Sequence, residues 1–373
     1  MKRALVVHPQ ISYYAGAELL CLYICESLQR AGYHVTLACD VFNPADADRH
    51  FGLGNVVQKC THKKILQFSP IIPYFVSLQK IIYAIRMRTL LSRTDAEVVF
   101  STQSSSFYIP KKKLFHVVYN ALDLFNYPLG SNLLGLNGSK QPMRRPYRSL
   151  LRQVRKFFLD RYSPEPTAFL AVGSRVLREL TQSGYNNSTL LLPPCRTIFQ
   201  PKFPRKKQVV QFARIIPDKR LELFIEIALR LPQYPFYIVG RPPELPNYEY
   251  FNKILLRLPR NVTYVNALTV ERADLLEHSK VYLYTGIESG IGIALIESIS
   301  AGCIPFSPRE VGAADVIEMS GIGHMYDSVE QAAEEIATVM ETEQSVEETY
   351  EVSAKARMFS PESFQKQIRK LVG

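Results

Sequence analysis

The residues that could do chemistry in this sequence begin with two cations, Arg214 and Lys219. Arg214 follows the apolar run 208–212, which predicts a β-strand, and Lys219 stands where the next helix should begin, at 219–230. Two cations beside a helix N-terminus, at the carboxyl edge of a parallel sheet, suit a pyrophosphate because backbone N–H groups and both side chains converge on the anion. Taken alone, the segment is also compatible with a solvated loop that carries a surface lysine.

A glycine-containing segment at 286–297 is the second candidate for ligand binding. Gly290 and Gly292 would let the backbone approach a ligand closely, and the helix predicted to follow them would add its positive end. Glu297 falls in the apolar run 293–299, where an unpaired carboxylate is costly, so a ligand with hydroxyl groups such as a ribose would explain it. A glutamate at the helix margin that faces water is the alternative. The segment is not the G-x-G-x-x-G fingerprint, because Leu295 occupies the third glycine position.

Short apolar strands that alternate with amphipathic helices must position these residues. This pattern predicts an α/β fold with parallel sheets covered on both faces. Prolines and a basic run near residue 200 break the pattern, so we expect two Rossmann-like, doubly wound domains, at 1–198 and 199–358. A C-terminal helix at 359–373 is expected to return to the first domain. Ligands bind at the carboxyl ends of strands in such sheets, which predicts an active site in the cleft between the domains. The expected strands are 4–7, 35–38, 97–101, 114–119, 168–172 and 190–192, then 208–212, 236–239, 262–265, 281–284, 304–307 and 324–326.

The composition is that of a globular protein, with 373 residues of which 47% are apolar and 21% charged. The six cysteines form no C-x-x-C pair and no metal-ligand spacing, so we interpret them as reduced core residues. The N-terminus lacks the apolar region of a signal peptide, and the most apolar stretch, 71–91, is interrupted by charges. The chain is therefore expected to be soluble or peripheral to a membrane.

Positive charge is concentrated in the first half of the chain. Residues 1–200 contain 25 Lys and Arg against 11 Asp and Glu, and residues 201–373 contain 20 against 23. Within the first half, the segment 140–161 has apolar residues at helical spacing and a basic opposite face. It either lies on an anionic membrane surface or packs on the sheet as a domain helix. The residues expected to contact the membrane are Arg144, Arg145, Arg148, Arg152, Arg155 and Lys156.

Together these segments resemble family 4 of the glycosyltransferases, which are retaining enzymes with the GT-B fold. The resemblance is strong over about 168–318 and weak over 41–160, and its joint pattern is specific although each motif is weak. The segment 193–197, taken with Gly292-Ile293 before Glu297, is similar to the dolichol-pathway α-1,2-mannosyltransferases. The matching motifs are Gly16-Ala17-Glu18, Phe169–Ser174, the segment 212–219, Tyr237-Ile238-Val239-Gly240, the segment 286–297, 301–305 and 311–313.

The resemblance assigns roles to individual residues. It implies that Arg214 and Lys219 hold the donor pyrophosphate, that Glu297 binds the ribose, and that Gly16 lines the cleft. The glycines Gly240, Gly290 and Gly292 fall in the motifs of the donor site.

The first glutamate of the family's motif is displaced in this sequence. Seven residues separate the family's two glutamates, which puts Ser289 at the first place, whereas Glu288 stands one residue early. Either a bulge lets Glu288 reach the donor sugar or Ser289 takes that role. His116 is a candidate contact to the transferred sugar, and a core or strand-end histidine is the alternative; His8 is a similar candidate.

The reaction that the resemblance implies is transfer of a hexose, with retention, from a nucleoside diphosphate sugar to a saccharide or polyprenyl-linked acceptor. Mannose from GDP-mannose is the donor that the resemblance favours, and no metal or other cofactor is expected. Asp46-Ala47-Asp48 is interpreted as a solvated turn and not as a metal-binding D-x-D motif. The alternatives are a GT-B sugar-nucleotide epimerase and a catalytically impaired binding protein at a membrane surface. Nucleic-acid binding is not expected, because no recognition motif is present. The expected location is the cytoplasmic face of a membrane.

Overall fold

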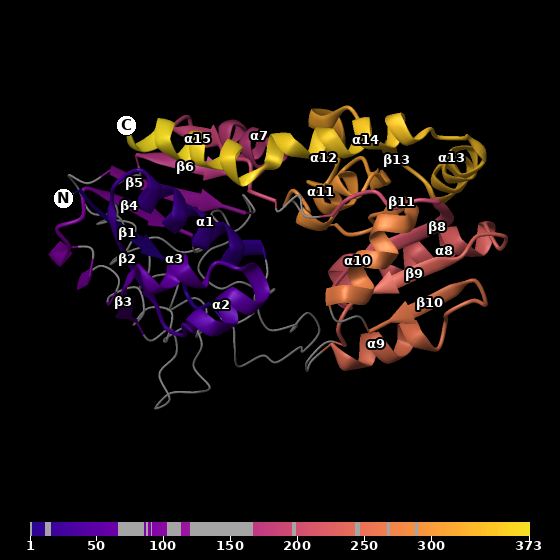
Figure 1. Ribbon diagram of the computed structural model, residues 1–373, viewed down its shortest axis with the longest axis horizontal. Coiled ribbons are helices and arrows are strands. Elements are labelled where there is room, and N and C mark those ends of the chain that lie inside the picture. The colour runs from indigo at the N-terminus through magenta and orange to yellow at the C-terminus, as the bar shows by residue number, and fades with distance from the viewer. Residues whose placement is uncertain are drawn as a thin grey trace. The chain divides into compact units, whose positions relative to one another are not determined.

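The computed structural model describes residues 2–11, 16–65, 86, 89–90, 92–102, 113–119, 167–195, 199–242, 247–266, 269–287 and 290–373. The chain forms two compact units, which Figure 1 shows with their elements labelled. Unit 1 comprises Met1–Val172, Val176–Leu192 and Phe364–Gly373, and unit 2 comprises Gly173–Arg175 and Pro193–Ser363. From the sequence we expect the junctions after residues 198 and 358; in the structure the compact units change after Leu192 and after Ser363, and the short segment Gly173–Arg175 also belongs to unit 2.

Unit 1 is built on a parallel sheet whose strands follow the order β3-β2-β1-β4-β5-β6-β7. The apolar runs that predicted strands are buried in it, because a sheet covered on both faces offers no solvated side. The strands are β1 (Arg3–Val7), β2 (His34–Cys39), β3 (Thr61–Lys64), β4 (Val98–Ser101), β5 (Lys113–Val118), β6 (Ala168–Ala171) and β7 (Ser188–Leu190).

The helices of unit 1 include one from the far end of the chain. The first is α1 (Gly16–Arg30), followed by α2 (Pro44–Phe51), α3 (Gly54–Gln58) and α7 (Ser174–Gln182). The last is α15 (Pro361–Val372), whose residues from Phe364 on belong to unit 1. There the Phe364 ring lies edge-on to Tyr23 of α1, with ring centroids 6.5 Å apart. The Gln367 side chain also accepts a hydrogen bond from the backbone N–H of Leu192, at 3.0 Å.

Unit 2 repeats the arrangement on a second parallel sheet, with the order β10-β9-β8-β11-β12-β13. Its strands are β8 (Lys206–Phe212), β9 (Phe236–Val239), β10 (Val262–Val265), β11 (Ser279–Leu283), β12 (Ile304–Pro308) and β13 (His324–Tyr326). Its helices are α8 (Leu221–Arg230), α9 (Tyr248–Leu255), α10 (Thr269–His278), α11 (Ile293–Ser300), α12 (Ala314–Ser320), α13 (Val329–Glu341) and α14 (Val346–Lys355).

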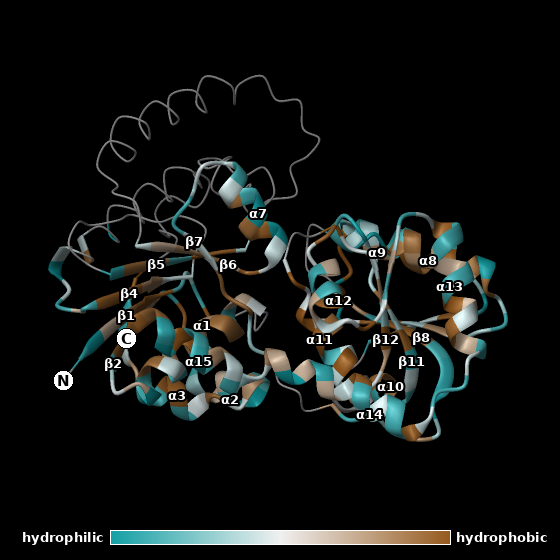
Figure 2. Ribbon diagram, turned by 90° about the horizontal axis from the view of Figure 1, so that it is seen from above, coloured by the Kyte–Doolittle hydropathy of each residue, from teal (hydrophilic) through white to brown (hydrophobic). Residues whose placement is uncertain are grey.

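The core of unit 2 packs α8, α9 and α13 against one face of this sheet. Phe224 of α8 meets Phe236 of β9 edge-on, with ring centroids 5.4 Å apart, and Ile336 of α13 is fully buried in the same cluster. In Figure 2 the strands of both sheets are mostly brown, and teal residues lie on the outer sides of the helices. Hydrophobic burial on both faces therefore fixes the strands, and their loop ends carry the polar residues.

No helix in the described part of the chain is both long enough and apolar enough to span a membrane.

Two local expectations were wrong. Asp46 and Asp48 lie in helix α2 and not in a turn, because Pro44 occupies the first helical position and the Asn43 side chain caps the helix. The helix expected from residue 219 begins at Leu221, after a 3₁₀ turn at Pro217–Lys219. Arg220 separates the two with a left-handed backbone, φ 46°, which a continuous helix does not allow.

Candidate functional site

The strand order of unit 2 marks one edge of its sheet for ligand binding. The chain passes from β8 outward through β9 and β10, then returns to place β11 on the other side of β8. The order therefore reverses between β8 and β11, and loops that leave these two strands diverge at their carboxyl ends. Such a switch point is where open α/β sheets bind ligands. The segments singled out in the sequence, 212–219 and 286–297, both follow these strands, since β8 ends at Phe212 and β11 at Leu283.

The turn that carries Lys219 has a defined backbone. Ile216 is extended, Pro217 starts the 3₁₀ turn, and the Lys219 N–H donates to the Ile216 carbonyl at 3.0 Å. The Lys219 side chain is partly buried, whereas Arg214, which stands nearer the end of β8, is exposed.

The loop after β11 is fastened to this turn. The Thr285 hydroxyl donates to the carbonyl oxygen of Lys219 at 2.7 Å, and the N–H of Ile287 donates to the carbonyl of Asp218 at 3.0 Å. The Gln211 side chain in β8 reaches the same hydroxyl at 3.0 Å, and both Gln211 and Thr285 are fully buried. Hydrogen bonds therefore hold the loop after β11 against the turn at Pro217–Lys219.

Tyr284 joins the cation to the glycine segment. The Lys219 Nζ lies 5.4 Å from the centre of the Tyr284 ring, a cation–π distance. The same ring would be 3.9 Å from a Cβ placed at Gly292, and the Tyr284 carbonyl accepts a hydrogen bond from Tyr326 at 2.8 Å. The Lys219 ammonium and the first residues of α11 are thus both next to the Tyr284 ring.

The glycines of the site differ in what requires them. A Cβ at Gly240 would overlap the carbonyl oxygen of Ala213, so no larger residue fits without a shift of the backbone. A Cβ at Gly286 would lie 2.7 Å from the Tyr284 hydroxyl. Gly292 has φ 66° and caps α11, which favours glycine. A Cβ at Gly290 would meet no atom within 4 Å, so the space beside it is open.

Glu297 lies in the second turn of α11 and is partly buried, with Ile296 and Ser298 fully buried on either side. The sequence predicts this helix at 294–301, and α11 spans Ile293–Ser300, one residue earlier at each end. The roles of Arg214, Lys219 and Glu297 toward a ligand stay predictions.

Three further cations at this edge were not singled out in the sequence. Arg220 follows Lys219, exposed Arg241 follows Gly240 after β9, and Arg309 follows β12, where it pairs with Asp327 at 3.1 Å. A cation within two residues of a predicted strand end was the signal that could have found Arg241 and Arg309. The carboxyl edge of this sheet therefore carries positive charge on loops from three strands, which favours an anionic ligand.

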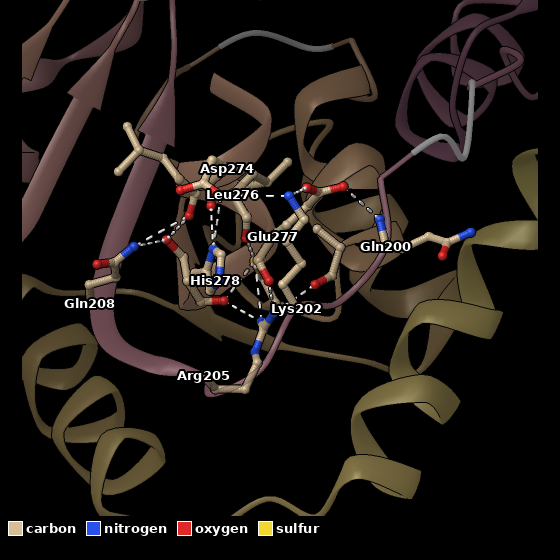
Figure 3. A network of polar contacts seen from close by, with 12 residues as sticks. Gln200, Lys202, Arg205, Gln208, Asp274, Leu276, Glu277 and His278 are labelled. Atoms are coloured by element: carbon tan, nitrogen blue, oxygen red, sulfur yellow. Dashed lines mark hydrogen bonds and ion pairs between the residues drawn. The ribbon is translucent and has the colours of Figure 1, made fainter. Parts of the chain in front are cut away.

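A second polar cluster in unit 2 lies at the opposite, amino edge of the sheet (Figure 3). Lys202 pairs with Glu277 at 2.8 Å, and the Glu277 carboxylate accepts the N–H of Gln200 at 3.1 Å. The Arg205 guanidinium donates to the carbonyls of Glu277 at 2.6 Å and Ala301 at 2.9 Å. These bonds tie the segment before β8 to the end of α10 and of α11, so the basic run predicted as linker begins with a structural arginine.

In unit 1 the two candidate histidines are buried. His116 lies in β5 beside Phe169, is 1% exposed, and burial lowers its pKa to about 3. His8 follows β1, with Nδ1 2.8 Å from the Thr102 hydroxyl, and burial lowers its pKa to about 4. Both imidazoles are therefore neutral at pH 7. Gly16 is the first residue of α1, after the β1 loop.

Several predicted residues lie outside the described part of the chain, so their roles stay predictions. They are Glu288 and Ser289, the two candidates for the role of the first motif glutamate, and the basic residues Arg144, Arg145, Arg148, Arg152, Arg155 and Lys156.

Comparisons with known proteins agree with this geometry. Residues 197–357 match the family model described as "Glycosyl transferases group 1". No curated protein matches the chain.

Among solved structures, the chain is similar to the Anabaena protein Alr3699/HepE in complex with UDP and glucose, with TM-score 0.69, 13% identity and 99% of each chain covered. It is also similar to WaaG, a glycosyltransferase involved in lipopolysaccharide biosynthesis, with TM-score 0.66, 15% identity, and 99% of this chain and 100% of that chain covered. Sucrose-phosphate synthase from Thermosynechococcus elongatus gives TM-score 0.69 at 14% identity, with 100% of this chain and 98% of that chain covered. Two Rossmann-like parallel sheets, a matching group 1 domain in the second unit and these likenesses show that the chain has the GT-B fold of glycosyltransferases.

Proposed function

We propose that the protein is a glycosyltransferase that uses a nucleoside diphosphate sugar as donor and binds it on unit 2. The observation that carries the proposal is the convergence of Lys219, the 284–287 loop and the start of α11 at the switch point of the second sheet. The match of residues 197–357 to a glycosyltransferase family model supports it, as does the UDP-glucose bound by the structurally similar HepE.

The chemistry follows from the charges at this edge. Breaking the bond between the sugar and the diphosphate leaves negative charge on the diphosphate, and cations fixed in advance stabilise that charge as it develops. Arg214, Lys219 and the positive end of α11 supply this stabilisation in the proposal. These groups would neutralise the leaving group without a metal ion. Glu297, one turn further along α11, would accept hydrogen bonds from the ribose.

The finer parts of the proposal rest on the sequence resemblance. They are transfer of a hexose with retention, mannose from GDP-mannose as the donor, and a saccharide or polyprenyl-linked acceptor bound by unit 1. The excess of positive charge in residues 1–200 supports docking of a diphosphate-linked lipid at the cytoplasmic face of a membrane. Pelleting with vesicles of anionic and of neutral lipid tests this part, and equal pelleting with both would contradict it.

Thermal unfolding with a panel of GDP, UDP and ADP tests the donor site. At least one diphosphate should raise the melting temperature, because a ligand that binds the folded state stabilises it. Arg214→Ala combined with Lys219→Ala should abolish the shift. A matched control is Lys207→Ala with Arg230→Ala, which removes one lysine and one arginine that pair with Glu341 and Glu330 instead. Equal shifts in both double variants would contradict the proposed site.

Donor hydrolysis and transfer assays distinguish a transferase from the alternatives. A transferase should move the sugar to an added acceptor, whereas an epimerase would release sugar or nucleotide without one. Binding of a diphosphate with no turnover of any donor sugar would favour the binding-protein alternative.

A further inference from the structure

Two fully buried polar side chains meet directly beneath the proposed diphosphate site. Gln211 belongs to β8 and Thr285 to the loop after β11, so they come from the two strands that flank the switch point. Each is 0% exposed. Burying an amide and a hydroxyl costs free energy unless both groups form hydrogen bonds, so the partners of these two side chains must be identified.

The direction of these hydrogen bonds follows from the proton count. The Thr285 hydroxyl has one proton and two acceptor oxygens within reach, the Lys219 carbonyl at 2.7 Å and the Gln211 Oε1 at 3.1 Å, and the shorter distance assigns the proton to the carbonyl. The Gln211 amide must then donate to the Thr285 oxygen, at 3.0 Å. The result is a chain of donors that runs from the centre of the sheet to the backbone of Lys219.

The same turn has a second fastening from the same loop. The N–H of Ile287 donates to the carbonyl of Asp218 at 3.0 Å, beside the carbonyl that Thr285 holds. Two consecutive carbonyls of the turn are therefore bonded to the loop after β11. A side chain outside the ligand site thus determines where the Lys219 backbone lies.

We propose that Thr285 and Gln211 are positioning residues that hold the Pro217–Lys219 turn so that the Lys219 ammonium faces the diphosphate. This inference rests on the proposed function of the site. Neither side chain contacts the ligand in this scheme; both act through Lys219. A preorganised cation is worth more than a mobile one, because its ordering cost is met before the ligand arrives.

The test compares Thr285→Val, Thr285→Ser and a matched control, Thr349→Val. Thr349 is also 0% exposed, and its hydroxyl donates to the Ser345 carbonyl at 2.8 Å in α14. Both valine variants therefore remove one buried hydroxyl from the same unit without changing the shape of the side chain. Melting temperatures report the loss of stability that the two share.

Two measurements separate positioning from stability. Calorimetric titration with GDP, UDP and ADP should show about tenfold weaker binding for Thr285→Val, the loss of one preorganising hydrogen bond, and wild-type binding for Thr285→Ser and Thr349→Val. Hydrogen exchange of the ligand-free protein should speed up at the amides of Lys219, Arg220 and Ile287 in Thr285→Val alone.

Each outcome decides the inference. Equal binding by Thr285→Val and Thr349→Val overturns it, as does unchanged exchange at residues 216–221. If the wild-type protein binds none of the diphosphates, the proposed function fails, and the exchange measurement still decides whether Thr285 fixes the turn. If both valine variants are destabilised, exchange is compared at a temperature where both remain folded, and faster exchange at residues 216–221 in Thr285→Val alone supports the inference whereas equal exchange overturns it.

Discussion

The two units place different chemistry at the same point of the same topology. In unit 1 the strand order reverses between β1 and β4, and the side chains that meet there are His8 and Thr102. In unit 2 it reverses between β8 and β11, where the Lys219 turn meets the loop that follows Leu283. The first pair is buried and neutral at pH 7, and the second carries a partly exposed cation.

The two switch points therefore share a topology and differ in charge. A cationic switch point suits a diphosphate, whereas the buried pair of unit 1 is bonded within the protein, where the Thr102 hydroxyl donates to the Val7 carbonyl at 2.8 Å. The comparison therefore predicts that the donor diphosphate binds at the switch point of unit 2, and that the acid sensitivity of unit 1 comes from its buried histidines. Three experiments, ordered by expected effect, test it in addition to those above.

The largest effect is expected from Gly240→Ala. A Cβ there would overlap the Ala213 carbonyl, so the ends of β8 and β9 must separate, at a cost of about 3 kcal/mol in the free energy of unfolding. Denaturant unfolding measures this cost. Gly290→Ala is the matched control for stability, because its Cβ would meet no atom within 4 Å. Equal unfolding of the two variants would show that the close approach at Gly240 is not required.

An intermediate effect is expected from acid. The pKa of His8 is lowered from 6.5 to about 4 and that of His116 from 6.5 to about 3, in both cases by burial. Below pH 6.5 the unfolded chain binds these protons and the folded chain does not, so stability is complete above pH 6.5 and falls as the pH falls toward the folded values. Each histidine should contribute a slope of up to about 1.4 kcal/mol per pH unit.

Denaturation midpoints between pH 7 and 4.5 measure this slope. His116→Leu should lower the slope of unfolding free energy against pH by the contribution of one histidine, up to about 1.4 kcal/mol per pH unit. This change in slope is independent of the variant's stability at pH 7. A slope that is unchanged in this variant would mean that His116 titrates alike in the folded and unfolded chain.

The smallest effect is expected from the Tyr284 ring. Tyr284→Leu removes the aromatic face that lies 5.4 Å from the Lys219 ammonium, and Tyr284→Phe retains it. Loss of a partly exposed cation–π contact is worth about 0.5–1 kcal/mol, so diphosphate binding should weaken about two- to fivefold in the leucine variant alone. Calorimetric titration distinguishes the two variants, and equal weakening in both would assign the effect to the hydroxyl.

The sequence predicted the elements that are strongly apolar and missed those that are not. The runs at 236–239 and 262–265 became strands β9 and β10 with the expected bounds, because buried parallel strands need continuous apolar residues. Strand β3, Thr61–Lys64, has four exposed polar side chains at the edge of its sheet, so hydrophobicity gave no signal. Helix α2 was missed although Asn43 and Pro44 are a cap and a first-turn residue.

For the candidate site, the sequence identified the charged and glycine residues but not what holds them. Arg214 and Lys219 stand out because cations after a strand are visible in one dimension. Gln211 and Thr285 are ordinary polar residues 74 positions apart, and only the pairing of β8 with β11 brings them together. A hydrogen bond between residues so far apart in the chain produces no recognisable local sequence pattern.

The return of α15 to unit 1 has a consequence for the order in which the protein can fold during synthesis. Helix α15 contributes Phe364 and Gln367 to unit 1, yet the ribosome makes these residues after all of 193–363. Unit 2 can therefore finish folding while unit 1, although translated first, still exposes the surface that Tyr23 and Leu192 present to this helix. N-terminal domains usually fold first during synthesis, but here unit 1 cannot complete its packing until α15 has been made.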